Sequence, residues 1–190
     1  CGSLAAQTCP NWELCAADAS DDAHAWVGEY LRGLPNVRYV KVENRGISAN
    51  TNAAAALATG EFLALADHDD VLAPHAVYEM LAAQRKTGAD FLYSDEALFT
   101  TDVLRPLTGH FKPDFAPDYL NCCNYICHLA VFRKSLFDEA GGLDPACDGS
   151  QDHDLFLKLS ERSAPVHVPK VLYYWRVPAQ STAGGVEAKP

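Results

Sequence analysis

The sequence predicts an α/β fold, Rossmann-like, in which a mainly parallel sheet is flanked by helices. In the first half of the chain, short apolar runs alternate with helical patterns, as in βαβ units. The run at residues 62–66 is wholly apolar and has the length of a strand buried on both faces. A chain of 190 residues suits one domain with a substantial core.

The elements of the first half follow one another in strand–helix order. Residues 12–17 and 37–42 are predicted strands, and a helix over residues 23–31 lies between them. An alanine-rich helix over residues 47–58 comes next, and its small side chains suggest close packing on the sheet. The apolar strand at 62–66 follows that helix.

The second half continues the alternation with less regular spacing. Its predicted elements are a helix over 74–87, strands over 91–94 and 126–133, a helix over 134–140, a helix after Gly149, and strands over 166–168 and 171–175. Residues 100–119 are irregular and rich in proline. We therefore expect one folded domain over residues 1–177 and a loose C-terminal tail over 178–190.

Charge and cysteine content narrow the classes of protein and partner. The chain carries 25 acidic and 15 basic side chains, a net charge of -10, which argues against binding nucleic acid. No apolar run is long enough to cross a membrane, so a membrane partner would be met only peripherally or through other parts of a longer protein. Seven cysteines and no visible signal peptide favour reduced thiols in a cytoplasmic setting.

An acidic cluster, Asp67-His68-Asp69-Asp70, follows the apolar strand at 62–66. In open α/β sheets, ligands bind where strands end, and adjacent carboxylates repel one another unless a cation lies between them. Residues two apart in an extended segment point the same way, so Asp67 and Asp69 could share one divalent ion. The alternative is that these acids begin a loop and cap the next helix. A D-x-D pattern is common by chance, and spacing leaves both interpretations open.

Several motifs occur in order along the chain. They are NRGISANTN at 44–52, ATGEF at 58–62, LADHDDVLAP at 65–74, YSDE at 93–96, FKPD at 111–114, NYICH at 124–128, GSQDHDL at 149–155 and LYYWR at 172–176. Together they resemble family 2 glycosyltransferases of the GT-A fold, of the bacterial polysaccharide-synthesis type. The resemblance runs nearly end to end, and the ordered set is far more specific than any one motif.

The resemblance implies a metal-dependent donor site at the acidic cluster. In such enzymes the D-x-D carboxylates hold a divalent metal, Mn²⁺ or Mg²⁺, and the ribose and diphosphate of a nucleotide-sugar. Carried over, Asp69 is the main metal ligand, and Asp67 is a second metal ligand or a ribose contact. Asp70 is expected to orient the loop instead, and His68 has no role beyond shape.

The resemblance also implies a general base in the acidic motif that opens the last helix. Asp152 matches that position, where a carboxylate would deprotonate the acceptor hydroxyl during direct displacement with inversion. The alternative is that Asp152 and Asp154 are first-turn acids favoured by the helix dipole. We favour the base for Asp152 and leave the role of Asp154 open.

Four further residues are candidates for binding the donor. Arg176 could neutralise diphosphate oxygens, or be a surface arginine that ends a strand. Asn44 is expected to shape the loop near the nucleotide, Asn52 to face the donor, and Asp18 to contact the base or ribose. Asp95 and Glu96 could lie near the acceptor, but acids in loops are usually solvated, and we expect that here.

Two departures from the family pattern bear on donor binding. The family opens with an apolar strand and a Pro-rich turn, whereas this sequence begins with what resembles the following helix, so we expect the first strand to be missing. The family has two acids after its second strand, and this sequence has Ala17 and Asp18 there. One expected contact to the nucleotide base is therefore an alanine. We therefore expect weak donor binding by this chain alone, and an exposed sheet edge through which a homo-oligomer could form.

The sequence thus predicts a glycosyltransferase that moves a sugar from a nucleotide-sugar to a glycan or lipid-linked saccharide, at the inner face of a membrane. A non-catalytic or truncated module that acts in binding or assembly is the alternative. A nucleotidyltransferase or phosphatase is disfavoured, because no GxxxxGK stretch is present. His128 and His167 lie in apolar surroundings and are expected to be satisfied core histidines.

Overall fold

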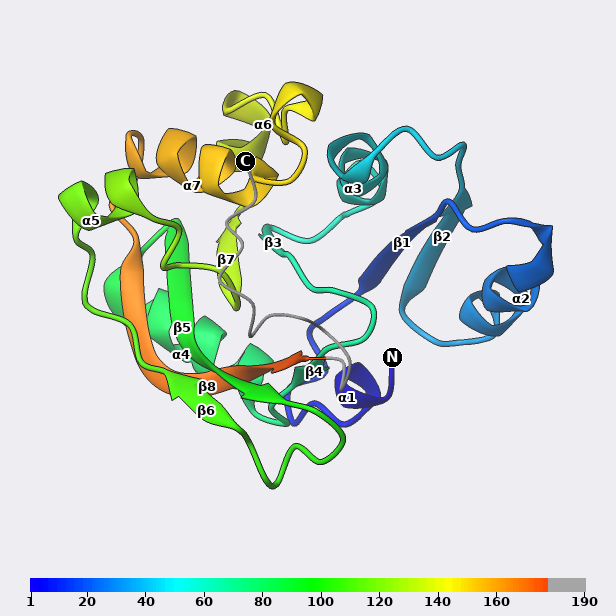
Figure 1. The fold of residues 1–190 in the computed structure, drawn as a ribbon, viewed down its shortest axis with the longest axis horizontal. Coiled ribbons are helices and arrows are strands. Elements are labelled where there is room, and N and C mark those ends of the chain that lie inside the picture. Colours follow the sequence, from blue (N-terminus) through cyan, green and yellow to red (C-terminus); the bar gives the residue numbers. More distant parts are fainter. Residues whose placement is uncertain (178–190) are drawn as a thin grey trace.

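A computed structural model of the chain describes residues 1–177 (Figure 1). Its strands are β1 (Leu14–Asp18), β2 (Val37–Lys41), β3 (Phe62–Ala64), β4 (Val71–Leu72), β5 (Phe91–Phe99), β6 (Thr108–His110), β7 (Ala130–Arg133) and β8 (Val166–Arg176). The helices are α1 (Gly2–Ala5), α2 (Trp26–Arg32), α3 (Ile47–Ala55), α4 (Ala76–Thr87), α5 (Pro117–Cys122), α6 (Lys134–Glu139) and α7 (Gln151–Ser160), with 3₁₀ turns η1 (Asp22–His24) and η2 (Pro145–Cys147). The predicted tail, 178–190, lies outside the described residues.

The strands form two sheets, which confirms the α/β class. A six-stranded sheet has the order β3–β7–β5–β8–β4 with β6 paired to β5, and β1 and β2 form a two-stranded sheet. The prediction of a mainly parallel sheet is wrong in detail, because only β1–β2 and β5–β8 are parallel and the other four pairings are antiparallel. The loop between β5 and β6, for example, is too short for the helical crossover that a parallel pair needs.

The core lies on both faces of β5, whose side chains alternate between two apolar clusters. Phe91 and Tyr93 pack with residues of α5, α6 and α7, such as Phe156, on one face. Leu92 packs with Met80 of α4 and with residues of β8 on the other face. Helices therefore cover the central sheet on both sides, and β5 is its most buried strand.

The apolar run at 62–66 is not the doubly buried strand that its composition predicts. β3 has only three residues, pairs on one side only, with β7, and leaves Ala64 exposed. Leu65 packs against the core from outside the strand. β3 is therefore an edge strand, and its apolar side chains pack on the core from the edge of the sheet rather than from its centre.

Two further predicted strands have different bounds in the structure. The strand predicted at 126–133 begins only at Ala130 as β7. Residues 124–129 before it form an irregular segment without helix or strand. The two short strands at 166–168 and 171–175 are one strand, β8, whose register against β5 shifts opposite residues Ser94–Glu96. This irregularity bends β8 so that its end reaches β4.

The two-stranded sheet forms a distinct part of the molecule, with α3 packed on β1 and α2 on β2 (Figure 1). No backbone ladder joins β1 to β3 within residues 1–177. Glu13 connects the two parts, because its Oε1 accepts hydrogen bonds from the backbone N–H groups of Thr59 (2.6 Å) and Gly60 (2.8 Å), just before β3.

Candidate active site

The acidic loop runs from the end of β3 to β4 and is fastened to β8. The hydroxyl of Tyr173 donates to Asp70 Oδ2 (2.6 Å) and accepts from the backbone N–H of Asp67 (3.0 Å). The backbone N–H of Arg176 donates to Asp70 Oδ1 (2.7 Å). Burial raises the pKa of the Asp70 carboxyl, although the bonds from Arg176 and Tyr173 lower it. Asp70 therefore orients the loop, as the sequence predicts.

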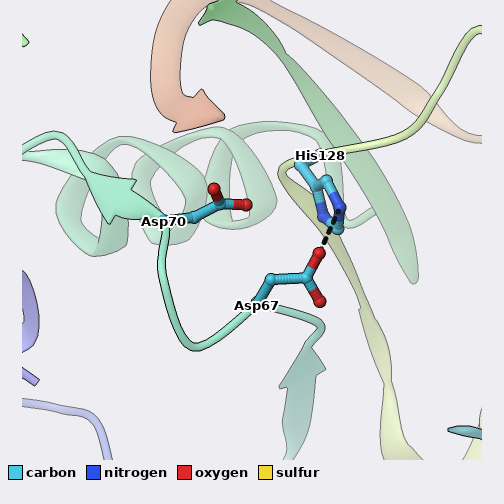
Figure 2. Close-up of side chains that lie close together, drawn as sticks. All are labelled: Asp67, Asp70 and His128. Atoms are coloured by element: carbon cyan, nitrogen blue, oxygen red, sulfur yellow. Dashed lines mark ion pairs between the residues drawn. The ribbon is translucent and has the colours of Figure 1, made fainter. Parts of the chain in front are cut away.

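His128 faces this loop from the segment before β7 (Figure 2). Its Nε2 lies 3.8 Å from Asp67 Oδ2, and its ring stacks on that of Tyr173 with centroids 4.5 Å apart. Potential ligand atoms of Asp67, Asp70 and His128 all lie within 4.8 Å of one another. Two carboxylates and an imidazole form a donor set that suits a divalent transition metal.

The prediction that His128 is a satisfied core histidine is wrong. Its Nδ1 is buried and has no hydrogen-bond partner among the described residues. A buried ring nitrogen without a partner is costly, and the His128 ring is held here by its stacking on Tyr173 and its approach to Asp67 instead. The motif NYICH placed His128 among the family-like residues, but nothing in the sequence indicated that it lies across from Asp67.

Asp69 lies beside this cluster rather than in it. Its side chain is exposed, and its backbone carbonyl accepts a hydrogen bond from Arg176 Nε (2.8 Å). Arg176 Nη1 also donates to the carbonyl of Thr100 (2.9 Å), and its guanidinium lies over the ring of Phe99. Arg176 thus links the acidic loop to the end of β5 through hydrogen bonds. Metal binding by Asp69 and diphosphate binding by Arg176 stay predictions.

Asp152 lies in the first turn of α7, where the helix dipole favours a carboxylate. Its Oδ2 accepts a hydrogen bond from Asn124 Nδ2 (2.7 Å), a residue of the same segment that carries His128. Asp154, two residues further on, instead pairs with Lys158 (2.6 Å) along the helix. The structure therefore distinguishes the two acids: Asp154 is engaged within its own helix, and Asp152 faces the Asn124 segment.

The remaining predicted donor residues lie in or beside the two-stranded part. Asp18, at the end of β1, is buried and accepts hydrogen bonds from the Ser20 backbone and from Tyr39 (2.7 Å). Burial raises the pKa of this carboxyl, but these bonds outweigh burial and hold the pKa well below its ordinary value. Asp18 thus shapes the end of β1, and its contact with a nucleotide stays a prediction.

Asn44 and Asn52 both make bonds that shape loops. Asn44 Oδ1 accepts from the backbone N–H of Gly46 (3.2 Å) and from Asn50, as predicted for a loop-shaping residue. Gly46 has φ 97, a conformation that favours glycine, and Asp148 lies where a side chain would be. Asn52 bonds the Leu143 backbone through both ends of its amide (2.8 and 2.9 Å). Its predicted donor contact is not tested by these bonds.

Asp95 and Glu96 correct another prediction, because both are buried at the centre of β5 rather than solvated. Asp95 Oδ1 accepts from His167 Nε2 (2.8 Å) and from the backbone N–H of Lys112 (2.9 Å). His167 is therefore a satisfied core histidine, as predicted. Buried acids in a strand can be told from solvated loop acids only when their distant basic partners are known.

The fold and the site together define an α/β protein of the glycosyltransferase type, with an acidic loop and a candidate base joined through one segment. The family model described as glycosyl transferase family 2 matches residues 2–141. The chain belongs to this family.

Relatives and solved structures agree with that membership. The chain is 39% identical to the uncharacterized protein y4gI of Sinorhizobium fredii, over 99% of this chain and 22% of the relative. It is 32% identical to the O-antigen biosynthesis protein RfbC of Myxococcus xanthus, over 95% of this chain and 15% of the relative. The chain therefore spans about a fifth or less of the length of these two relatives.

A crystal structure of S. aureus TarS in complex with UDP-GlcNAc has the same fold. It matches with a TM-score of 0.76 at 17% identity, over 93% of this chain and 53% of that one. This likeness confirms the GT-A fold. Among the described residues, no helix has both the length and the apolar character that a membrane crossing requires.

Proposed function

We propose that this chain transfers a sugar from a nucleotide-sugar donor to a hydroxyl of a glycan or lipid-linked saccharide, with Mn²⁺ or Mg²⁺ and with inversion. The observation that carries the proposal is the segment 124–128, which contacts the candidate base, Asp152, through Asn124 and the acidic loop through His128. Family membership supports glycosyl transfer as the reaction class.

The residues that would hold the metal are Asp67, Asp70 and His128, with Asp69 as a further candidate from the motif. The cluster fits the ion, because it combines two carboxylates with an imidazole and their potential ligand atoms all lie within 4.8 Å of one another. Because an imidazole nitrogen is a softer ligand than an oxygen, this donor set favours Mn²⁺ over Mg²⁺. When bound, such an ion offsets the negative charge of the donor's diphosphate.

Asp152 is proposed to take the proton from the acceptor hydroxyl. The acceptor oxygen forms a bond to the anomeric carbon on the face opposite the leaving group, as the bond from that carbon to the phosphate oxygen breaks. The electron pair stays with the nucleoside diphosphate, and the proton goes to the Asp152 carboxylate. The hydrogen bond from Asn124 fixes Asp152 Oδ2, so Oδ1 is the oxygen assigned to the acceptor.

The donor and the acceptor are proposed by analogy with the relatives. UDP-GlcNAc is bound in the TarS complex, and RfbC is named for O-antigen biosynthesis. We therefore propose a UDP-sugar donor and a bacterial surface-polysaccharide acceptor, used on the cytoplasmic side of the membrane. The chain would meet that membrane peripherally.

A non-catalytic module is the second candidate, favoured by one observation. The two-stranded part that carries Asp18 has no backbone ladder to β3 in the described residues. A donor that must bridge Asp18 and the acidic loop would then depend on how firmly the bonds of Glu13, Ser48 and Asn52 hold these two parts together.

The test is transfer from UDP-GlcNAc in the presence of Mn²⁺, with Asp152→Asn compared against Asp154→Asn. If Asp152 is the base, Asp152→Asn lowers kcat by about 100-fold or more while calorimetry shows unchanged binding of Mn²⁺ and UDP. Asp154→Asn keeps the rate, because Asp154 pairs with Lys158 on its own helix rather than with the segment 124–128. A rate retained in Asp152→Asn would contradict the assignment. A chain that binds neither Mn²⁺ nor UDP would favour the non-catalytic module.

A further inference from the structure

Lys112 and Glu96 form a buried ion pair that contacts the backbone of the segment 124–128. The side chains of Lys112 and Glu96 are 0% and 2% exposed, and Lys112 Nζ lies 3.5 Å from Glu96 Oε2. Lys112 Nζ also donates to the carbonyls of Ile126 (2.5 Å) and His128, and Glu96 Oε2 accepts from the backbone N–H of His128 (3.0 Å). Three hydrogen bonds from one ion pair therefore converge on the segment.

The backbone of this segment needs such partners. Tyr125 and Ile126 are buried, yet residues 124–129 belong to no helix or strand, and Cys127 has φ 41. Buried backbone groups outside a ladder must be bonded by side chains or water. Glu96 on β5 and Lys112, two residues after the end of β6, supply those bonds.

Burying the Lys112–Glu96 ion pair carries a large desolvation penalty compared with apolar side chains. Burying two charges costs several kcal/mol each before their attraction is counted, and apolar residues of similar volume are often as stable. Burial lowers the pKa of Lys112, while the charge of Glu96 raises it. The pair is itself held, because Glu96 Oε1 contacts His110 Nδ1 (3.0 Å) and Asp95 accepts from the Lys112 backbone.

The segment that this pair fixes makes contacts at both of its ends. Asn124 donates to Asp152 Oδ2, and His128 Nε2 faces Asp67. The Cα atoms of Asn124 and His128 are at most about 14 Å apart, since four residue steps separate them. A shift of the segment would therefore move both contacts together.

We propose that Glu96 and Lys112 are positioning residues that fix the segment 124–128, and so set the candidate base Asp152 relative to the acidic loop. This rests on the proposed function. Within residues 1–177, neither side chain is hydrogen-bonded to the acidic loop or to Asp152, so each acts through Asn124 and His128.

The test replaces the pair by apolar residues of similar size, in the double variant Glu96→Met/Lys112→Met. This variant leaves no unpaired buried charge, so it is expected to fold, with a Tm lowered by the backbone groups of the segment that lose their partners. Hydrogen exchange in the peptide that covers 124–129 is expected to quicken at least about tenfold. Mn²⁺ affinity and kcat are each expected to fall about 10- to 100-fold, as when the partners of metal ligands are removed.

The matched control is Glu79→Met/Lys170→Met, which removes an ion pair (2.7 Å) between α4 and β8 that makes no contact with the segment. It should keep wild-type exchange at 124–129, wild-type Mn²⁺ affinity and wild-type kcat. If Glu96→Met/Lys112→Met does not fold, Glu96→Gln/Lys112→Met is measured instead, since it keeps the shape at position 96 and also leaves no unpaired buried charge. It should show the same changes to a smaller extent.

A folded variant with wild-type exchange at 124–129 and wild-type Mn²⁺ affinity would overturn the proposal. Loss of kcat with unchanged exchange would overturn it too, because the segment would not have moved. If the wild type itself neither binds Mn²⁺ nor transfers sugar, the proposed function fails. The exchange measurement would still decide whether the pair holds the segment.

Discussion

The hydroxyl of Tyr173 bonds to both ends of the acidic loop, at Asp70 Oδ2 and at the backbone of Asp67. The same residue stacks under His128, so one buried side chain contacts all three members of the Asp67–Asp70–His128 cluster. Burial and the neighbouring carboxylate raise the pKa of the Tyr173 hydroxyl above its ordinary value, so it stays a hydrogen-bond donor at neutral pH. The acidic loop is therefore held largely by the hydrogen bonds of one hydroxyl group.

Tyr173→Phe tests this at the scale of one oxygen atom. The change leaves the Asp70 carboxylate half-buried with one bond fewer, and we expect the free energy of unfolding to fall by about 1–3 kcal/mol. Mn²⁺ affinity should fall as well, because the loop that carries Asp67 loses its anchor. Urea unfolding and Mn²⁺ titration measure the two effects. Tyr174→Phe, the next residue on β8, is the control, and an equal loss there would contradict this role of the Tyr173 hydroxyl.

At the scale of elements, Glu13 is the connection between β1 and the turn before β3. Its carboxylate accepts from Arg38 Nε (2.5 Å) on β2 and from the backbone of Thr59 and Gly60. Burial raises the pKa of Glu13, but the bonds from Arg38, Thr59 and Gly60 outweigh it and lower the pKa from 4.5 to about 2. The ionised form is therefore the one that the fold stabilises.

The pH dependence of stability follows from this lowered pKa. The stabilising contribution of Glu13 is fully present above its unfolded pKa of 4.5 and is lost as pH falls toward about 2. Over that window, the wild type should lose more unfolding free energy than Glu13→Gln, as measured by urea unfolding at several pH values. Glu43→Gln, at an exposed pair with Arg45, serves as the control and should follow the wild type. Parallel curves for the wild type and Glu13→Gln would contradict the assignment.

At the scale of the whole molecule, the two sheets differ in how firmly they are held. β5 pairs with β6, β7 and β8 and is buried along nearly its whole length, whereas β1 and β2 pair only with each other. A two-stranded sheet is marginal unless helices pack on it, and α2 and α3 supply that packing here. The part that carries Asp18 therefore depends on fewer contacts than the part that carries the acidic loop.

Native-state hydrogen exchange should show this difference directly. Amides of β5 are expected to exchange slowest, near the rate set by global unfolding, and amides of β1 and β2 to exchange faster through local opening. Exchange measured peptide by peptide at neutral pH gives the comparison. Equal protection of β1 and β5 would mean that the molecule opens only as one unit.

Much of the arrangement was predictable, and the failures have a common cause. The helix after Pro74 ends at Gly88 as expected, since φ 71 there favours glycine. The antiparallel neighbours of β5 and the edge position of β3 were missed, because an apolar run does not indicate which strand it will pair with. Strand order is decided by connections and packing over the whole chain.

The candidate site divides in the same way. The sequence by itself determined the α/β class, the order of most elements apart from β4, β6 and α5, the acidic loop at the end of an apolar strand and Asp152 at the start of α7, because these are patterns among neighbouring residues. Only the tertiary structure decided that His128 faces Asp67, that Asn124 bonds Asp152, and that Glu96 is buried against Lys112. Each of these pairs joins residues far apart along the chain. Their approach depends on the packing of β5, β7 and β8, which no local pattern encodes.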